Sequence, residues 1–392
     1  MSKILLGWEL GGNYGHVNQL KSLSRCLMRS GHDVYFALPR IDAARMVFEP
    51  PEYLVQAPVW PNCLKDVYRQ IPSERAANYG DTLVQFCFDK KWALRSMMSG
   101  WEAIINNIKP NAIIADSAPA LLMASKGRIP TIRIGSGYDV PPASMKEFPP
   151  LFGKPAVENH LLAIDYVNQS LNLFGRSTIE YLPECLMSDQ DMVAAFEAFD
   201  PYRQWRQTEY LTPVVPCPLP EISQRKGEEV FVYYQSVTKE AIPLWEALAE
   251  AKLPVRIHIP DMDDIHAAAF KNLGFIVELD PVPILDVVKN SRMIISHGGL
   301  GMSSTALLCG IPHLILSHDL EKSLNGQAIS KIGVGEHMSI FEITKNSVLG
   351  KILDLYQGSY KDRKLFKTAI QFRKKITSSF HEDVALAVNN WI

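Results

Sequence analysis

The sequence predicts an α/β protein with two doubly wound, Rossmann-like domains, each built on a parallel sheet. Its 392 residues are enough for two domains. In both halves, short apolar segments typical of buried strands alternate with longer segments of helical periodicity. Between the halves, residues 210–227 contain four prolines, which favour a linker over a helix or a strand. Together these three observations predict the fold class.

The domain limits follow from the same pattern. We expect residues 1–215 to form the first domain, residues 216–227 the linker and residues 228–360 the second domain. The last segment, 361–392, is basic and apolar and is predicted to be a helix. In open parallel sheets ligands bind at the carboxyl ends of the strands, so functional residues are expected where strands end.

Composition and charge are those of an ordinary globular protein. Hydrophobic residues make up 47% of the chain, and a net charge of -2 does not favour a broad nucleic-acid surface. The six cysteines form no C-x-x-C pair, so we expect neither disulfides nor a cysteine metal site, and a reducing compartment fits. There is no signal-peptide pattern and no apolar run that would span a bilayer. We therefore expect a cytoplasmic protein, while peripheral membrane contact stays open.

The first domain opens with a strand, a turn, a helix and a second strand. Residues 4–6 are apolar, residues 11–15 form a glycine-rich turn, apolar residues follow at helical spacing as far as Met28, and residues 34–38 are the next strand. The turn lacks G-x-G-x-x-G spacing, so by itself it is a weak indication of nucleotide binding. His16 stands at the helix entrance, where a side chain that titrates near neutral pH would suit a general base.

A second candidate lies at the end of another strand. Residues 111–117 have the pattern of a strand that ends in Asp116, at the sheet edge where ligands bind. An aspartate on the other ring nitrogen of a catalytic histidine fixes its tautomer and stabilises the imidazolium. Asp116 would also suit a helix N-cap, so both interpretations stay open.

Two further segments could contact a ligand. Residues 83–108 carry apolar side chains at three-and-four spacing, which predicts one long amphipathic helix. Core packing is one interpretation of its methionines and aromatic residues, and the lining of an apolar ligand pocket is the other. Residues 135–155 are rich in Gly, Pro and Ser and are predicted to form a loop near the active cleft.

The second domain contains the stretch with the clearest chemistry. The apolar strand 293–295 leads into residues 296–304, Ser-His-Gly-Gly-Leu-Gly-Met-Ser-Ser, where a helix begins. Glycines let the backbone approach a ligand, and a helix start presents unpaired N–H groups and a positive end. The ring of His297 adds a donor. This arrangement suits a diphosphate without a metal ion.

The pattern continues downstream and carries a resemblance to a known family. After His297-Gly298-Gly299-Leu300-Gly301 come Gly310-Ile311-Pro312, Glu321-Lys322 with Asn325, and Gly333-Val334-Gly335. In spacing, this resembles the donor-binding motif of GT-B glycosyltransferases of the UDP-glycosyltransferase and antibiotic-macrolide type. The resemblance implies a GT-B fold with a cleft between the two domains and a last helix that crosses back to the first domain.

The resemblance also implies a reaction and roles for residues. It implies an inverting, metal-independent transfer of a sugar from a UDP- or dTDP-sugar to a hydroxyl of a small or lipid-like acceptor. Gly15-His16 matches the family's Gly-His motif, which makes His16 the catalytic base and Asp116 the residue that orients it. The donor-binding candidates lie in the glycine-rich stretches and at the family's donor positions: Gly12, Asn13, Ser236, Val282, His297, Gly298, Gly299, Gly301, Met302, Ser303, Glu321, Lys322 and Asn325.

Two positions depart from the family motif. Met302 replaces the usual Thr, although Ser303 and Ser304 are adjacent, and Glu321-Lys322 replaces the Asp-Gln pair that holds sugar hydroxyls. These departures keep a second function open, that of a catalytically weak glycosyltransferase-like protein that binds or activates a partner. A third is another GT-B enzyme such as a UDP-sugar 2-epimerase.

No cofactor is expected, since the nucleotide sugar is a co-substrate. Asp261-Met262-Asp263 has the D-x-D form of metal-dependent glycosyltransferases but lies in a Pro- and acid-rich turn, so we predict no metal site. The expected partners are the nucleotide sugar and its acceptor, and not a nucleic acid. The identity of the acceptor and of the sugar, and the choice between UDP and dTDP, stay open.

Overall fold

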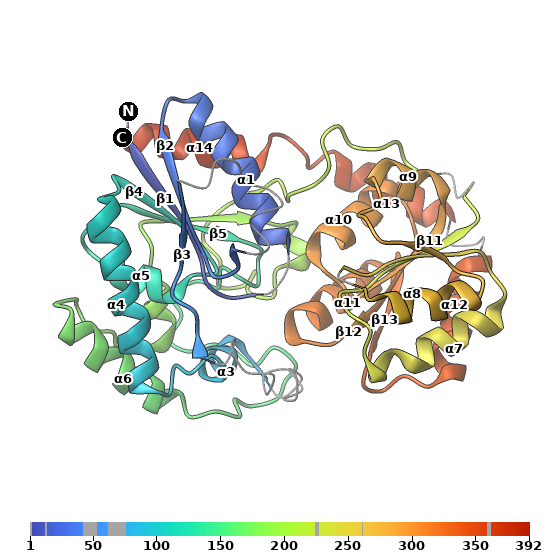
Figure 1. The fold of residues 1–392 in the computed structure, drawn as a ribbon, viewed down its shortest axis with the longest axis horizontal. Coiled ribbons are helices and arrows are strands. Elements are labelled where there is room, and N and C mark those ends of the chain that lie inside the picture. The colour runs from blue at the N-terminus through green and yellow to red at the C-terminus, as the bar shows by residue number, and fades with distance from the viewer. Residues whose placement is uncertain are drawn as a thin grey trace. The chain divides into compact units, whose positions relative to one another are not determined.

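The chain folds into two compact units, seen in the computed structural model of Figure 1. The structure describes residues 2–11, 14–41, 53–61, 76–223, 227–260, 262–358 and 362–392. Unit 1 comprises Met1–Val214 and Ser378–Ile392, and unit 2 comprises Val215–Thr377. The change of unit after Val214 falls close to the start of the expected linker, and the C-terminal end of the chain belongs to unit 1.

Unit 1 is a doubly wound parallel sheet. The described strands lie in the order β3-β2-β1-β4-β5-β6-β7, so the strand sequence reverses direction between β1 and β4. The strands are β1 (Lys3–Trp8), β2 (Asp33–Leu38), β3 (Leu54–Gln56), β4 (Ala112–Asp116), β5 (Thr131–Gly135), β6 (Gln190–Ala194) and β7 (Tyr210–Leu211). The helices are α1 (Tyr14–Arg29), α3 (Tyr79–Gln85), α4 (Lys91–Ile108), α5 (Pro119–Ser125), α6 (His160–Leu173) and α14 (Phe380–Trp391), with 3-10 turns at Leu182–Leu186 and Glu197–Phe199.

Helices cover both faces of this sheet. On one face, apolar residues of α1 and α14 pack against alternate residues of β1, β4 and β5 in one core cluster. On the other face, β1 comes close to α4 and α5 at Gly7, where an added Cβ would lie 2.2 Å from Leu121 Cδ2 and 3.1 Å from Trp101. Successive residues of β1 point to opposite faces of the sheet, and helices cover both faces, so β1 is buried along nearly its whole length.

Unit 2 repeats the plan with a six-stranded sheet in the described part, in the order β10-β9-β8-β11-β12-β13. Its strands are β8 (Glu229–Tyr233), β9 (Val255–His258), β10 (Ile276–Glu278), β11 (Ser291–Ser296), β12 (His313–Ser317) and β13 (Gly335–Ser339). Its helices are α7 (Ile242–Ala251), α8 (Asp264–Asn272), α9 (Ile284–Asn290), α10 (Leu300–Cys309), α11 (Leu320–Ile332), α12 (Lys345–Gln357) and α13 (Asp362–Arg373), with a 3-10 turn at Lys239–Ala241. Here the order reverses between β8 and β11.

Two predicted helices are each divided in two. The expected helix 83–108 is α3 followed by α4, and the two are separated by a turn that contains Phe86, Cys87 and Phe88, all of them buried. Cys87 has φ of +71°, which ends the helical path. On α4, Met97 and Met98 are at most 2% exposed. The core-packing interpretation of these methionines is therefore correct.

The C-terminal segment 361–392 is also two helices, α13 in unit 2 and α14 in unit 1. The break contains Thr377, Ser378 and Ser379, and Ser379 is the N-cap of α14. Short hydroxyl side chains compete for backbone hydrogen bonds and favour helix starts over helix interiors. Phe380, Val384 and Val388 of α14 then join the core of unit 1.

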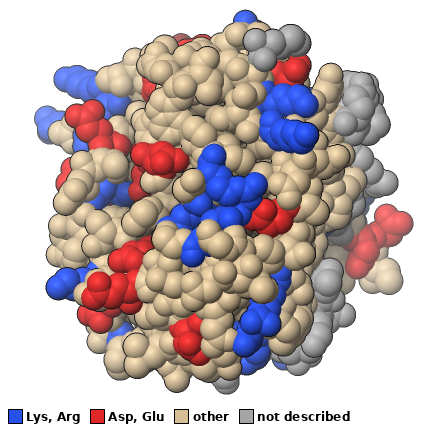
Figure 2. Space-filling view, turned by 90° about the vertical axis from the view of Figure 1, so that its left-hand side faces the viewer, with Lys and Arg blue, Asp and Glu red and all other residues tan. Residues whose placement is uncertain are grey.

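Surface charge is mixed on the face shown in Figure 2. Lys and Arg side chains alternate there with Asp and Glu across a largely uncharged surface, and no broad single-sign area covers this face of the described residues. Such a face lacks the continuous basic surface that binds a phosphate backbone. This agrees with the net charge of -2.

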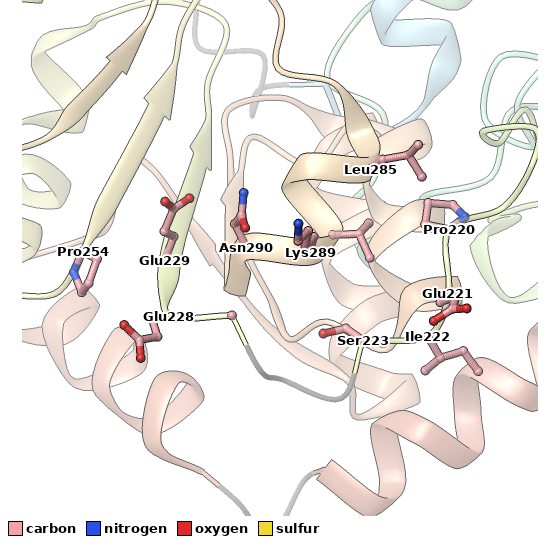
Figure 3. Close-up of a pocket in the computed structure, with 12 residues that line it drawn as sticks. Pro220, Glu221, Ile222, Ser223, Glu228, Glu229, Pro254, Leu285, Lys289 and Asn290 are labelled. Atoms are coloured by element: carbon pink, nitrogen blue, oxygen red, sulfur yellow. The ribbon is translucent and has the colours of Figure 1, made fainter.

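A cavity of about 730 Å³ lies at the amino ends of β8 and β11 (Figure 3). Leu285 and Lys289 of α9 lie on one side, and the segment 220–223 lies on another. The Glu229 carboxylate at its wall already accepts hydrogen bonds from Arg256 at 2.7 and 2.8 Å. The cavity is at the edge of the sheet opposite the strand ends that bind ligands in such folds.

Candidate functional site

The two candidate catalytic residues of unit 1 lie together at the β1–β4 switch point. The two strands pair in parallel, with Trp8 beside Asp116 at their carboxyl ends. His16 follows β1 in the first turn of α1, and its Nδ1 is 3.0 Å from Asp116 Oδ2. The imidazole stacks on the indole of Trp8, with ring centroids 5.0 Å apart and an interplanar angle of 19°. The carboxylate of Asp116 and the indole of Trp8 therefore both help to hold the ring.

Burial differs between the two partners. The Asp116 side chain is 1% exposed, while the His16 side chain is 23% exposed. Burial raises the pKa of Asp116, and the charge and hydrogen bond of His16 oppose that rise. With Nδ1 directed at the carboxylate, Nε2 is the ring nitrogen that can exchange a proton with a ligand. This arrangement suits a general base whose ring is oriented by the carboxylate of Asp116.

The loops next to the pair have special backbone geometry. Gly11 has φ of +100°, and a Cβ added there would lie 2.8 Å from His16 Nε2. Ser117, directly after Asp116, has φ of +45°, and its carbonyl accepts a hydrogen bond from Leu10 N at 3.0 Å. Strained backbone of this kind clusters at functional sites. The predicted residues Gly12 and Asn13 lie outside the described residues.

A buried carboxylate that sequence reasoning missed, Glu9, lies at the carboxyl end of β1 in the same sheet. Glu9 is 2% exposed and accepts hydrogen bonds from Trp60 Nε1 at 2.9 Å, Ala120 N at 3.1 Å and Leu121 N at 2.7 Å. Burial raises its pKa to about 7, although these hydrogen bonds act in the opposite direction. Glu9 joins the end of β1 to the start of α5. The signal in the sequence was an acid placed directly after a buried strand.

A second missed carboxylate anchors the loop after β5. Asp81 is fully buried and accepts hydrogen bonds from His160 Nε2 at 3.0 Å and from the backbone N–H groups of Ala77, Val157 and Glu158 at 2.8 to 3.2 Å. The network joins α3 to residues 157–160 at the start of α6, so it holds the chain just after the predicted loop 135–155. A sequence pattern does not reveal an anchor whose donors lie about 80 residues away.

Asp81→Asn is expected to lower the free energy of unfolding by about 2 kcal/mol near neutral pH, since buried donors lose a charged acceptor. Burial raises the pKa of Asp81, but the hydrogen bonds from His160 and the backbone outweigh it and lower the pKa overall. A lowered pKa means that this stabilisation is present above the usual value of about 3.9 and fades as the pH falls through the folded value. Denaturant unfolding of both proteins should therefore converge in acid. Asp165→Asn, at an exposed position of α6, is the control. A difference that stays constant between pH 6 and pH 3 would contradict the ionised role of Asp81.

In unit 2, the residues His297–Gly299, named here the glycine loop, connect β11 to α10. Gly298 has φ of +97°, its N–H donates to Ser296 Oγ at 3.0 Å, and its carbonyl accepts from Asn325 Nδ2 at 2.9 Å. Ser296 Oγ is in turn 2.8 Å from His313 Nε2, in a fully buried contact. Both backbone groups of Gly298 are thus fixed by side chains. Asn325, predicted to bind the sugar donor, holds the glycine loop through this hydrogen bond.

His297 is almost completely buried, at 4% exposure. Burial is the largest cause that lowers its pKa to about 3, and the charge of Lys322 adds to it. The ring is therefore neutral at physiological pH and can act as a hydrogen-bond donor or acceptor but not as a cation. Its Nδ1 makes no hydrogen bond to the described residues, and the rings of Tyr233, Tyr234 and His318 lie 5.5 to 6.0 Å away.

Helix α10 starts immediately after the loop. Its N-cap, Gly299, provides no side-chain hydrogen bond, so the first N–H groups of the helix are left for a ligand. Gly301 is exposed in the first turn, and an added Cβ there would meet nothing within 4 Å. This is the open, positively polarised surface that an anionic phosphate group requires.

The remaining donor candidates differ in accessibility. Met302 is partly buried against the core cluster under α10, and Val282 packs against the same cluster. The Ser303 hydroxyl is buried and has no partner among the described residues, so it does not present an open replacement for the family's Thr. Ser236 is half-buried in the bend after β8, the strand beside β11. Ser236 and the glycine loop therefore follow neighbouring strands.

The Glu321 and Lys322 side chains belong to a charged group after β12. Asp319 caps α11 by accepting from Lys322 N at 2.8 Å, and its other oxygen is 3.2 Å from His318 Nε2. The Lys322 ammonium donates to the Glu321 carboxylate and lies 4.0 Å from Asp319. Burial raises the pKa of Asp319, but the positive charge of Lys322 and the contacts of His318 outweigh it and hold the pKa well below its usual range.

Among the described residues, no group of three or more His, Cys, Asp or Glu side chains is placed to hold a metal ion. Asp261 of the D-x-D stretch lies outside the described residues. Asp263 is the N-cap of α8 and accepts from His266 N at 2.8 Å. None of the helices in the described ranges is long and apolar enough to cross a membrane.

Comparison with known proteins places this geometry in context. Residues 254–377 match the family described as erythromycin biosynthesis protein CIII-like, C-terminal domain. Over 100 residues the chain is 28% identical to erythronolide mycarosyltransferase of Saccharopolyspora erythraea. That match spans 26% of this chain and only 23% of the length of the relative.

Solved structures match over the whole chain. The structure of the glycotransferase of kitacinnamycin has a TM-score of 0.68 at 16% identity. The match covers 100% of this chain and 99% of the kitacinnamycin protein. Spinosyn rhamnosyltransferase SpnG complexed with thymidine diphosphate has a TM-score of 0.65 at 15% identity, with 99% and 100% covered. At such identities the likeness establishes the fold, and the predicted GT-B fold is confirmed. The sequence resemblance to glycosyltransferases of the UDP-glycosyltransferase and macrolide type is confirmed as well.

Proposed function

We propose that this protein is a glycosyltransferase, because residues 254–377 match the family described as erythromycin biosynthesis protein CIII-like, C-terminal domain, and the chain has the GT-B fold. We propose an inverting, metal-independent reaction that moves a sugar from a UDP- or dTDP-sugar to a hydroxyl of a small or lipid-like acceptor. The observation that carries the proposal is the glycine loop, where Gly298 is fixed through both its N–H and its carbonyl ahead of an uncapped helix start. Such a site suits a diphosphate.

The reaction follows from the groups that each unit contributes. His16 Nε2 takes the proton of the acceptor hydroxyl, which makes the ring an imidazolium. Asp116, which contacts Nδ1, stabilises that positive charge. The acceptor oxygen forms a bond to the anomeric carbon as the bond from that carbon to the phosphate oxygen breaks. One displacement from the opposite face inverts the anomeric configuration.

The leaving nucleoside diphosphate would be stabilised by unit 2. The hydrogen-bond donors of unit 2 would be the N–H groups at the start of α10 and the neutral ring of His297. Donors that are already fixed cost little reorganisation as charge develops on the leaving oxygen. Support for the nucleotide comes from SpnG, a protein of the same fold whose structure holds thymidine diphosphate. dTDP is therefore the first nucleotide to test, and UDP the second.

Thermal unfolding with ligands tests the donor site. We expect UDP or dTDP to raise the melting temperature in the presence of EDTA, because a ligand at 100 times its dissociation constant adds about 2.7 kcal/mol to the native state. UMP, dTMP and adenosine diphosphate are the matched comparisons. If no nucleoside diphosphate shifted the transition, or if a shift appeared only with added divalent metal, the proposed donor site would be wrong.

Glu321→Ala is expected to weaken binding of the nucleotide sugar about 10-fold, because a carboxylate hydrogen bond to a sugar hydroxyl is worth about 1.5 kcal/mol. Binding of the free nucleoside diphosphate should stay unchanged. Calorimetric titration of both ligands measures the difference, and Glu342→Ala, on the loop after β13, is the control. Equal effects on the two ligands would place Glu321 outside the sugar subsite.

A further inference from the structure

A charged group of four side chains distinguishes this donor site: His318, Asp319, Glu321 and Lys322, named here the β12–α11 charge cluster. It follows the carboxyl end of β12, whose residue Ile315 pairs with Ser296 at the end of β11. The cluster therefore occupies the strand end next to the glycine loop. In the resembling family the positions of Glu321 and Lys322 hold an Asp-Gln pair, so the cation is a departure from the family motif.

The first turn of α11 lies directly against the glycine loop. A Cβ added at Gly298 would lie 3.1 Å from the Lys322 carbonyl oxygen and 3.5 Å from Lys322 Cβ. One turn further along, Asn325 Nδ2 donates to the Gly298 carbonyl at 2.9 Å. Lys322 is 8% exposed, and its ammonium donates to the Glu321 carboxylate. The cation is thus confined to the neighbourhood of the loop by packing and by an ion pair.

The rest of the described loop provides donors without a full positive charge. His297 is neutral at physiological pH, and the nearby charge of Lys322 is one reason for its lowered pKa. The start of α10 contributes the equivalent of about half a charge. A nucleoside diphosphate carries two or more negative charges, so a further cation beside the loop would strengthen its binding without a metal.

We propose that Lys322 is that cation and binds the donor diphosphate directly, in an inference that rests on the proposed function. Asp319 is used as the cap of α11 and by His318 Nε2, so its carboxylate stays in place. Glu321 is the partner that a phosphate oxygen replaces. The exchange transfers Lys322 from Glu321 to the diphosphate and turns the Glu321 carboxylate to the sugar hydroxyls. One ion pair therefore prepares two contacts with the donor.

Titration of Lys322→Gln with UDP, dTDP and the corresponding monophosphates tests this role. Gln is the residue that the resembling family has at this position, and it removes the positive charge. We expect diphosphate affinity to fall about 10- to 100-fold at low salt, as for the loss of one hydrogen bond to a charged group, and monophosphate affinity to change less than about 2-fold. The salt dependence of diphosphate binding should also become less steep.

Two variants accompany it. Lys322→Arg keeps the charge and should retain most of the affinity, whereas Glu321→Gln removes the competing carboxylate and should leave diphosphate affinity unchanged or higher. Thermal unfolding of each variant reports whether α11 is intact. If Lys322→Gln bound diphosphate as the natural protein does, or lost affinity only for a donor whose sugar carries a carboxylate, the assignment to the diphosphate would be wrong. If the natural protein bound no diphosphate at all, the proposed function would fail together with this role.

Discussion

Replacing His16 by alanine is expected to lower the turnover number about 10²- to 10⁴-fold, the usual contribution of a positioned general base. The affinity for the nucleoside diphosphate should not change, since the base belongs to unit 1 and the glycine loop to unit 2. Steady-state kinetics and calorimetric titration of the same preparation separate the two quantities. His32→Ala, near the other end of α1 where His32 bonds Asn389 at 2.7 Å, is the matched control.

The contact between His16 and Asp116 makes this expectation sharper. Asp116→Asn keeps the shape of the side chain but removes the charge that faces Nδ1, so it should lower turnover as well. Because Asp116 is expected to act through His16, the double variant should be no slower than His16→Ala alone. Independent, multiplying losses would show that Asp116 acts apart from His16, for example through the fold of the loop at Ser117.

Gly298→Ala is expected to have the largest effect on donor binding. A residue with a Cβ pays about 1–2 kcal/mol for a left-handed conformation, and the φ of Gly298 is +97°. The new Cβ would also lie 2.6 Å from Ile315 Cγ2, so the loop must shift. A displacement of about 1 Å in a preorganised site costs about 100-fold. Calorimetry should therefore show at least a 100-fold loss of diphosphate affinity and a small drop in melting temperature.

Gly350→Ala is the matched control for that change. Gly350 lies in α12 and is not a donor-binding candidate, an added Cβ there would meet nothing within 4 Å, and alanine favours a helix by up to about 1 kcal/mol over glycine. Its stability should be equal or higher and its diphosphate affinity close to that of the natural protein. If Gly298→Ala also bound diphosphate normally, the fixed geometry of the glycine loop would have no part in donor binding.

Local sequence patterns were sufficient to predict the fold class and to place His16, Asp116 and the glycine loop at the ends of strands, while their roles stay predictions. Strands rich in apolar residues, followed by glycine-rich turns, indicate a parallel sheet and its ligand edge wherever they occur, so His16, Asp116 and the glycine loop could be located by residue number. In both units the candidate residues lie at the switch point of the sheet, between β1 and β4 and between β8 and β11. That position is a consequence of strand order, which the motifs alone do not contain.

Contacts between distant residues decided what the sequence did not reveal. Glu9 bonds residues 51 to 112 positions away, and Asp81 bonds residues up to 79 positions away, so local patterns do not show which segments these carboxylates join. The same holds for the division of the expected helix 83–108, where Cys87 has φ of +71° and apolar periodicity does not reveal the break. Single-residue propensities do not contain such tertiary preferences.

The most direct test of the proposed function is product analysis of the purified protein with UDP- and dTDP-sugars and a panel of small and lipid-like hydroxyl acceptors, in EDTA. Mass spectrometry should find a glycosylated acceptor and an equal amount of nucleoside diphosphate, and the anomeric configuration of the product, read by NMR, should be opposite to that of the donor. Both products should form about 10²- to 10⁴-fold more slowly in His16→Ala. An isomerised nucleotide sugar, a product of retained configuration, or donor binding without any transfer would contradict the account.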